Sequence, residues 1–144
     1  MVIEISKTSK RKVNKLIELA FLGDSDLIEH YHAANDNMQD SILHTIERID
    51  VTSMAYQLSF YKVTVDKVNA GFFVTGDNFL YSFGLNMKFR KKEILMKWWE
   101  MVCGELKPNF ICMMNKKNTR GINFLKKQGM IVISNGNEIL TLKY

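Results

Sequence analysis

The chain has 144 residues, of which 47% are apolar and 24% are charged, and its formal net charge is +5. This length is typical of one domain, and the apolar share is high enough to build a core and to exclude a disordered chain. No apolar run approaches the roughly 20 residues that a membrane-spanning helix needs, and the N-terminus lacks a signal-peptide pattern. We therefore expect a single soluble, cytoplasmic domain over residues 1–144, with no membrane partner.

The positive charge is concentrated in the second half of the chain. Between residues 86 and 128 there are eleven Lys or Arg against three Glu, which gives +8, so the rest of the chain carries −3. A basic half indicates a polyanionic partner: a nucleotide-like cofactor, a phosphate-rich surface or a nucleic acid, although no nucleic-acid-reading motif is present. A solvated lysine face is the alternative explanation.

The N-terminal segment predicts one short strand followed by a helix. Alternation of apolar residues at Val2–Ser6 indicates the strand. Apolar residues at helical spacing predict a helix at Lys10–Phe21, which Ser9 caps and Gly23 ends.

Two more helical segments are expected, at residues 26–34 and 38–50, and three histidines lie in them. His30 and His32 would project roughly 200° apart on a helix, so they are poorly placed to share an ion. No carboxylate or cysteine completes a ligand set with them or with His44 at a standard spacing. We expect no metal site.

The hydrophobic period changes after residue 50. Segments rich in Val, Phe, Tyr and Thr predict strands or pieces of strands. These segments are Met54–Phe60, Lys62–Val65, Ala70–Thr75 and Phe79–Leu85. Gly76-Asp77-Asn78 marks a tight hairpin turn, and residues 66–69 mark a looser one, so the region predicts an antiparallel meander.

A basic turn follows strand Phe79–Leu85 and leads into an amphipathic helix from about Phe89 to Cys103. Such a junction points the N–H groups of the first helical turn and the positive end of the helix dipole at one place. Four cations lie in or next to this turn: Lys88, Arg90, Lys91 and Lys92. Residues 79–103 therefore predict an anion site, most naturally one for phosphate.

The same helix carries an apolar stripe that is expected to pack on the sheet. The stripe consists of Ile94, Leu95, Trp98, Met101 and Val102. Trp98 and Trp99 are assigned to the core and its edge, and Gly104 to the end of the helix. Cys103 and Cys112 lie in apolar context and are expected to be buried thiols rather than a disulfide or a metal site.

The C-terminal third predicts a strand, a helix and a hairpin. Phe110–Met114 is fully apolar, which predicts a strand buried on both faces, in a parallel or central position. Asn118 is a good N-cap for the helix that Gly129 ends. An Asn-Gly step joins the final strands, Met130–Ser134 and Glu138–Lys143.

This order of elements and two motifs resemble the GCN5-related N-acetyltransferase (GNAT) superfamily over roughly residues 51–144. The first motif is Phe83-x-Leu85-x-Met87-Lys88-Phe89-Arg90, and the second is Asn118-Thr119-Arg120-Gly121-Ile122-Asn123-Phe124-Leu125-Lys126-Lys127-Gln128-Gly129-Met130. The resemblance implies an α/β (α+β) fold with a mixed, mostly antiparallel central sheet flanked by helices. Residues 1–50 would be a mainly helical part of this domain, and residues 51–144 its sheet and acyl-CoA-binding core.

The resemblance also implies a cofactor and an activity. Acetyl-CoA would lie where the junction strand splays from its neighbour, and the acetyl group would pass to an amine of a small molecule or a protein. In the family the junction carries Gln/Arg-x-x-Gly-x-Gly/Ala, whose N–H groups hold the pyrophosphate, and this chain has Arg90 at the first position. The implied cofactor-binding residues are Phe83, Leu85, Arg90, Lys91, Lys92, Glu93, Ile94, Leu95 and Asn118.

Three residues depart from the family pattern. Glu93 and Leu95 replace two small residues, which makes the backbone less approachable and puts a negative charge near a diphosphate. Lys91 and Lys92 offset this charge in part. Leu125 stands where the family often has the tyrosine that protonates the leaving thiolate, and a leucine has no proton to give.

If acetyl transfer takes place, the amine would attack the thioester directly, while the backbone N–H of Leu85 or a neighbour polarises the carbonyl. The sequence identifies no catalytic residue. Candidates for the general base are Tyr81, Glu47, Asp77 and His44.

A second, weaker resemblance leads to small GNAT-like proteins of tailed bacteriophages. Three features carry this resemblance: the glycine-free basic entry Lys88-Phe89-Arg90, the central apolar strand, and the later pattern of Asn118, Phe124-Leu125-Lys126 and Gly129. The glycine-free junction and Leu125 favour a non-enzymatic relative. It implies the alternative function, a catalytically inactive binding or structural protein such as a virion or ejection component.

Overall fold

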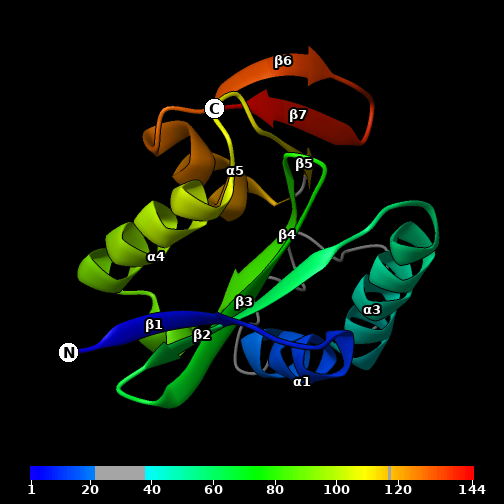
Figure 1. Cartoon of the computed structure of the whole chain (residues 1–144). Coiled ribbons are helices and arrows are strands. Elements are labelled where there is room, and N and C mark those ends of the chain that lie inside the picture. Colours follow the sequence, from blue (N-terminus) through cyan, green and yellow to red (C-terminus); the bar gives the residue numbers. More distant parts are fainter. Residues whose placement is uncertain (22–37, 117) are drawn as a thin grey trace.

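The structure is a computed structural model, and it describes residues 1–21, 38–116 and 118–144. Seven strands form one sheet in the order β1-β2-β3-β4-β5-β7-β6 (Figure 1). The strands are β1 (Ile3–Lys7), β2 (Ser59–Val65), β3 (Val68–Gly76), β4 (Phe79–Leu85), β5 (Ile111–Asn115), β6 (Ile131–Asn135) and β7 (Ile139–Lys143). The α-helices are α1 (Lys10–Phe21), α3 (Met38–Ala55), α4 (Lys92–Glu105) and α5 (Thr119–Lys127).

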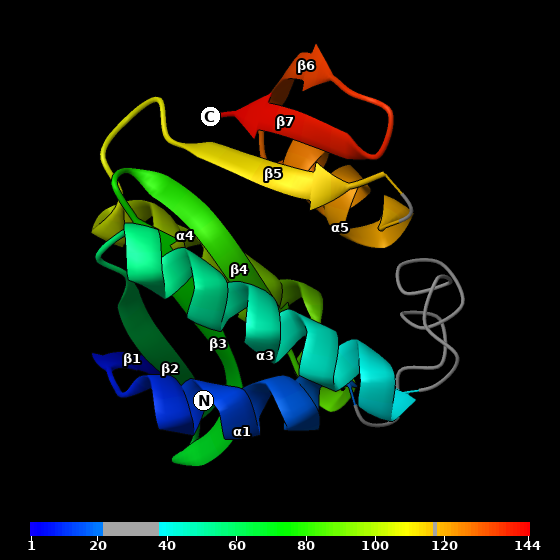
Figure 2. The ribbon, with the colours of Figure 1, turned by 90° about the vertical axis from the view of Figure 1, so that its right-hand side faces the viewer.

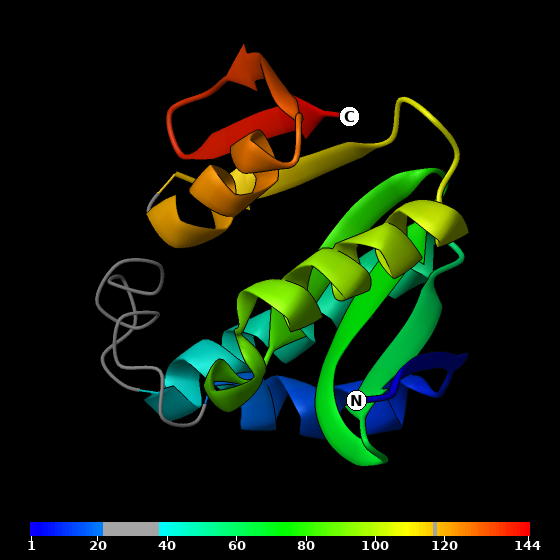
Figure 3. The same cartoon turned by 90° about the vertical axis from the view of Figure 1, so that its left-hand side faces the viewer.

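Helices cover both faces of the sheet, and each face has its own core. Figure 2 shows α1 and α3 on one face, and Figure 3 shows α4 on the other. The α1 and α3 side buries a small cluster that includes Val13, Ile17 and Phe72. The larger cluster lies against α4 and α5, where Trp98 and Trp99 are both buried, which confirms their assignment to the core.

The first strand and helix match their predictions. β1 pairs antiparallel with β2, and α1 spans the predicted residues. The Lys12 N–H donates to Ser9 Oγ at 3.1 Å, so Ser9 caps the helix as expected. Gly23, which is expected to end the first helix, the predicted helix at residues 26–34, and His30 and His32 lie outside the described residues, as does the side chain of His44.

Helix α3 runs to Ala55, five residues beyond the predicted end at residue 50. The prediction of a strand beginning at Met54 is therefore wrong, and β2 is one continuous strand. Two hydrogen bonds extend the helix past its β-branched residues. The Ser53 hydroxyl donates to the Asp50 carbonyl at 2.7 Å, and the Thr52 hydroxyl donates to the Tyr81 hydroxyl. Tertiary contact with β4 thus overrides the local strand preference.

Strands β2, β3 and β4 form the predicted antiparallel meander, with two tight turns. Asp77 and Asn78 both have positive φ, 47° and 63°, which confirms the second turn. The looser turn expected at residues 66–69 is wrong, because Asp66 and Lys67 alone form the bend, at φ 49° and 67°. Positive φ at both central residues gives the twist that a two-residue hairpin needs.

The junction between β4 and α4 differs from the prediction in its first turn. A short 3₁₀ turn occupies Met87–Phe89, and α4 begins at Lys92, three residues later than expected. The Asn86 side chain accepts the Lys88 N–H at 3.2 Å, and the Arg90 N–H donates to the Met87 carbonyl at 3.1 Å. These short-range bonds close a tighter turn before the helix begins. At its other end, α4 continues through Gly104 to Glu105.

Strand β5 has the predicted central position, parallel to β4 and antiparallel to β7. The prediction that both faces of β5 are buried is wrong, because Met113 is 53% exposed while Cys112 and Met114 are buried. β6 and β7 form the predicted terminal hairpin, and the bounds of the two strands differ slightly from the predicted ones. No described helix is both long enough and apolar enough to span a bilayer.

Helix α5 has the predicted boundaries. Asn118 Oδ1 accepts the Gly121 N–H at 3.0 Å, which confirms its N-cap role. Gly129 has φ +100°, and the Met130 N–H donates to the Leu125 carbonyl at 3.1 Å. This pairing of a left-handed glycine with a bond back into the last turn ends the helix at that point.

Candidate functional site

Strands β4 and β5 separate after two paired positions. Phe79 pairs with Ile111 and Leu80 pairs with Cys112, and in the described residues the pairing of these strands ends there. Figure 2 shows the two strands close at one end and apart at the other. β5 remains paired with β7 over its whole length, so the opening lies beside the C-terminal half of β4.

A β-bulge at Tyr81 changes which side chains face α3. Leu80 is opposite Thr75, and Ser82 is opposite Val74, so Tyr81 is the extra residue. Consecutive strand residues normally point to opposite faces, and a bulge breaks this alternation. As a result, Tyr81 and Ser82 both line the same cavity on the α3 side.

The ladder between β3 and β4 aims two backbone N–H groups at the opening. The Asn86 N–H donates to the Ala70 carbonyl at 2.7 Å, and Leu85, the residue before it, lies opposite Gly71. Alternate residues of an antiparallel ladder point their N–H groups toward the partner strand and away from it. The N–H groups of Leu85 and Phe83 therefore point away from β3, toward the side where β5 has diverged.

A cleft of about 460 Å³ lies at the end of β4, and we call it the β4 cleft. Residues of α1, β3, β4, the junction, α4 and the start of α5 line it. They are Ala20, Phe72, Phe83, Gly84, Leu85, Met87, Arg90, Leu95, Trp98, Asn118, Arg120, Gly121 and Phe124. Its walls are mainly apolar, with two arginines and one amide among the lining side chains.

Five of the nine residues that the sequence indicated for the cofactor line the β4 cleft: Phe83, Leu85, Arg90, Leu95 and Asn118. Lys91, Lys92 and Glu93 are exposed and do not line it. Ile94 is 3% exposed and belongs to the core. The carboxylate of Glu93 therefore does not block the β4 cleft, and Leu95 forms one of its walls.

Arg90 is held against the end of β4. Its Nε donates to the Leu85 carbonyl at 2.8 Å, which ties the basic turn back to the strand. This bond holds the guanidinium at the β4 cleft rather than in bulk solvent. Lys88, by contrast, places its Nζ 5.0 Å from the centre of the Phe89 ring and does not line the cleft.

Two glycines of the β4 cleft have no room for a side chain. A Cβ on Gly84 would lie 2.8 Å from the Phe72 ring, and a Cβ on Gly121 would lie 2.7 Å from the Met114 methyl group. Gly84, Gly121 and Arg120 are not among the residues that the sequence indicates for the cofactor. Only Gly121 and Arg120 have a sequence signal, because both lie in the motif that begins at Asn118.

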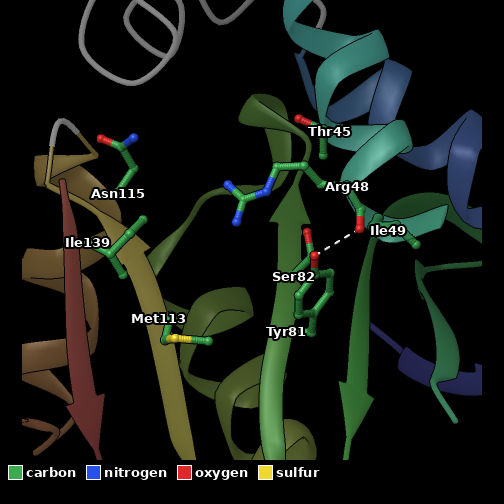
Figure 4. Close-up of a pocket in the computed structure, with 8 residues that line it drawn as sticks. All are labelled: Thr45, Arg48, Ile49, Tyr81, Ser82, Met113, Asn115 and Ile139. Atoms are coloured by element: carbon green, nitrogen blue, oxygen red, sulfur yellow. Dashed lines mark hydrogen bonds between the residues drawn. The ribbon is translucent and has the colours of Figure 1, made fainter. Parts of the chain in front are cut away.

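A second hollow lies between α3 and strands β4 and β5, and we call it the α3 groove. It consists of a wider cavity of about 680 Å³ and a smaller one of about 110 Å³, which share Arg48, Tyr81 and Met113. Figure 4 shows the smaller cavity, with Arg48 above Tyr81 and Ser82 and opposite Asn115 of β5. Three candidate bases, Tyr81, Glu47 and Asp77, line the α3 groove, although no sequence pattern places them together.

The cysteines do not form a reactive centre. Both are free thiols, but only Cys112 is buried as predicted, and burial raises its pKa to about 12. Burial also raises the pKa of Cys103, which is partly buried. Both groups are therefore thiols rather than thiolates at neutral pH.

Helix α5 presents Phe124 to the β4 cleft and buries Leu125 completely in the core. No hydroxyl side chain is among the described residues that line the cleft. This part of the site can hold an apolar chain and an anion, but it offers no side-chain proton donor of the tyrosine type.

No protein-family model and no curated protein sequence matches the chain, whereas solved structures do match it. PaiA N-acetyltransferase from Thermoplasma acidophilum, in complex with coenzyme A, has a TM-score of 0.66 at 19% identity, with 100% of each chain covered. YjaB from Escherichia coli in its apo form has a TM-score of 0.71 at 14% identity, covering 100% of this chain and 98% of that one.

A third similar structure is an acetyltransferase from Salmonella typhimurium that modifies the N-terminal serine of ribosomal protein L7/L12. Its TM-score is 0.60 at 11% identity, and the match covers 100% of this chain and 95% of that one. At these identities the likeness concerns the fold, and it agrees with the mixed sheet and the parting of β4 and β5. The chain therefore has the fold of the GCN5-related N-acetyltransferases.

Proposed function

We propose that the protein is an acyl-CoA-dependent N-acetyltransferase that transfers an acetyl group from acetyl-CoA to an amine. The observation that carries this proposal is the early separation of β4 from β5, with hollows on both sides of the strand. A cofactor in the β4 cleft and an acceptor in the α3 groove would meet through this opening. Direct transfer between two bound molecules needs such a passage.

The residues of the β4 cleft fit the parts of acetyl-CoA. Phe83, Leu95 and Phe124 give apolar walls for the pantetheine arm, and the lack of side chains at Gly84 and Gly121 leaves room beside it. The Lys91 side chain does not cap α4, so the first N–H groups of this helix can bind a phosphate oxygen. Arg90 and Arg120 add positive charge at the same cleft.

Acetyl-CoA supplies an activated thioester, and the chain's part is to orient it and to receive the amine. The Leu85 N–H, which points into the opening, would donate to the thioester carbonyl oxygen and stabilise the charge that develops there. The amine nitrogen would bond to the acyl carbon as the bond from carbon to sulfur breaks. Because the described lining of the cleft offers no hydroxyl, the leaving thiolate would take its proton from water.

Glu47 and Tyr81 are the candidates at the α3 groove for handling the proton of the amine. Glu47 is exposed at the wider part of the groove, and its carboxylate would receive this proton through a bound water. The Tyr81 hydroxyl donates to the Arg48 carbonyl at 3.0 Å and accepts from Thr52, so it sits in a fixed position beside the groove. Because its own proton is already in place, Tyr81 would orient the water rather than receive the proton.

The solved structures support the cofactor and the acceptor class. PaiA was crystallised with coenzyme A, and the Salmonella enzyme acetylates a protein N-terminus. The acceptor of this chain would accordingly be an amine of a small molecule or of a protein. The bacteriophage structural alternative stays a prediction, since none of these comparisons tests it.

Acetyl-CoA binding by Arg90→Glu tests the proposal. We expect acetyl-CoA to raise the melting temperature of the native chain, and Arg90→Glu to weaken its affinity by about tenfold or more, since a reversed charge at a phosphate site costs upwards of about 1.4 kcal/mol. Lys97→Glu is the matched control, because Lys97 is exposed on α4 and does not line the cleft. A native chain that shows no shift with millimolar acetyl-CoA, or an equal loss in both variants, would contradict the proposal.

A further inference from the structure

Arg48 is the charged residue that all parts of the α3 groove share. It lines both the smaller and the wider cavity, and it also borders a third, minor hollow beside Phe79 and Ile111. In the smaller cavity it is the one charged side chain among the described lining residues. The chemistry of the groove next to the opening therefore depends on this guanidinium.

The backbone around Arg48 is fixed to the sheet. Its carbonyl accepts the Tyr81 hydroxyl at 3.0 Å, and the next residue, Ile49, is 1% exposed in the core. Figure 4 shows the guanidinium extending from α3 over the space between Ser82 and Asn115. The side chain thus starts from a rigid helix and projects into the groove.

The described residues give the Arg48 guanidinium no carboxylate partner. Asp50, two residues further along α3, pairs instead with Lys10 Nζ of α1 at 2.8 Å, and neither residue lines the groove. Glu47 and Asp77 line the wider cavity and do not line the smaller one. An arginine in such a position is a ready partner for an oxyanion, which it can bind through two parallel N–H donors.

We propose that the acceptor is an amine that also carries an oxyanion, a carboxylate or a phosphate, a few bonds from its nitrogen. The oxyanion would bind Arg48, which places the amine in the smaller cavity near Ser82, at the opening between β4 and β5. The rest of the acceptor would lie in the wider cavity against Phe79, Ile111 and Met113. This inference rests on the proposed function and gives the substrate class of the same site.

The same charge selects against other amines. An amine with a second ammonium group at this spacing would bring a positive charge to Arg48, which costs affinity. An amine without any charged group would gain nothing from it. The wider cavity adds an apolar and aromatic surface, so an acceptor with an apolar body is favoured over a bare small amine.

Matched pairs of amines test the proposal on the full chain. Binding of L-phenylalanine and of L-phenylalaninamide, which lacks the carboxylate, is measured by ligand-observed NMR with and without coenzyme A. We expect phenylalanine to bind about tenfold more tightly than its amide, the value of one charge-assisted pair at a partly exposed site. O-phosphoethanolamine and ethanolamine form a second pair, which distinguishes a phosphate from a carboxylate as the preferred anion.

Arg48→Ala should abolish the preference within each pair, and Arg48→Lys should keep part of it. Arg11→Ala is the control, because Arg11 is exposed on α1 and lines none of these hollows. Equal binding within both pairs, a preference that survives in Arg48→Ala, or no binding of any probe at millimolar concentration would overturn the inference. Acetyl-CoA binding is measured separately, so a chain that prefers anionic amines yet ignores acetyl-CoA would refute the proposed function and leave this site standing.

Discussion

Gly84 stands where β4 meets the β4 cleft, and its missing side chain keeps the cleft open. Its close neighbours lie on the α1 side of the sheet, because a Cβ there would meet the Phe72 ring at 2.8 Å and the Ala20 methyl at 3.2 Å. Leu85, the next residue, aims its N–H at the same opening. One residue thus supplies space and its neighbour supplies a hydrogen-bond donor.

Gly84→Val should weaken acetyl-CoA binding by about tenfold or more and lower the free energy of unfolding by about 1–3 kcal/mol, because the branched side chain must displace the Phe72 ring or enter the cleft. Isothermal titration calorimetry and urea denaturation measure the two effects. Gly104→Ala is the control: nothing lies within 4 Å of its Cβ, so binding should stay unchanged and stability should rise by up to about 1 kcal/mol. A folded Gly84→Val with native affinity would show that the cofactor does not pass this residue.

At the level of single residues, motif position predicted part of the site. Arg90 and Asn118 were assigned from their motifs, and both line the β4 cleft. Ile94 was assigned in the same way, yet it turns into the core, because α4 begins at Lys92 and the helix phase decides which side chain faces inward. When a helix begins at a different residue than expected, each of its side chains faces a different direction from the expected one.

The two hairpin turns of the meander hold non-glycine residues at positive φ. Lys67 has φ 67°, a conformation that costs an L-residue with a long side chain about 1 kcal/mol relative to glycine. The turn is nonetheless kept, because Asp66 Oδ1 accepts the Val2 N–H at 2.7 Å and so ties the turn to the N-terminus beside β1. Local strain is offset by a contact that is distant in the sequence.

Lys67→Gly should raise the free energy of unfolding by about 0.5 kcal/mol, because glycine removes the positive-φ strain while loosening the unfolded chain. The same substitution at Lys97, an exposed position within α4, should lower it by about 1 kcal/mol. Urea denaturation of both variants checks the opposite signs. A loss of stability in Lys67→Gly would mean that the turn does not carry the strain assigned to it.

Element types were more predictable than element ends. Strand Phe79–Leu85 and helix Lys10–Phe21 have the predicted bounds, because their apolar period is strong and a cap or a turn lies beside each. Helix α3 is longer than predicted because its last turn is stabilised by Tyr81 of β4, a partner that the local sequence pattern does not reveal. Met113 is exposed because its face of β5 borders the α3 groove, which depends on where α3 packs.

At the scale of the whole molecule, the site arises from the topology of the sheet. β5 enters beside β4 as a parallel strand, pairs with it briefly, and then follows β7 instead. Side chains from α3, β4 and β5, far apart in the chain, thereby border one opening. The sequence indicated the β4 side of this opening through the basic junction, but it gave no signal for the α3 groove or for Arg48.

The β4 cleft and the α3 groove give the fold two entrances to one opening, and acetyl-CoA should enter by the β4 cleft. A titration of ¹⁵N-labelled protein with acetyl-CoA, followed by amide chemical shifts, shows where the cofactor binds. We expect shifts at Gly84, Leu85 and Gly121, which border the β4 cleft, and none at Gly136, in the turn between β6 and β7. Shifts confined to the β6 and β7 hairpin, or none at saturating acetyl-CoA, would contradict this expectation.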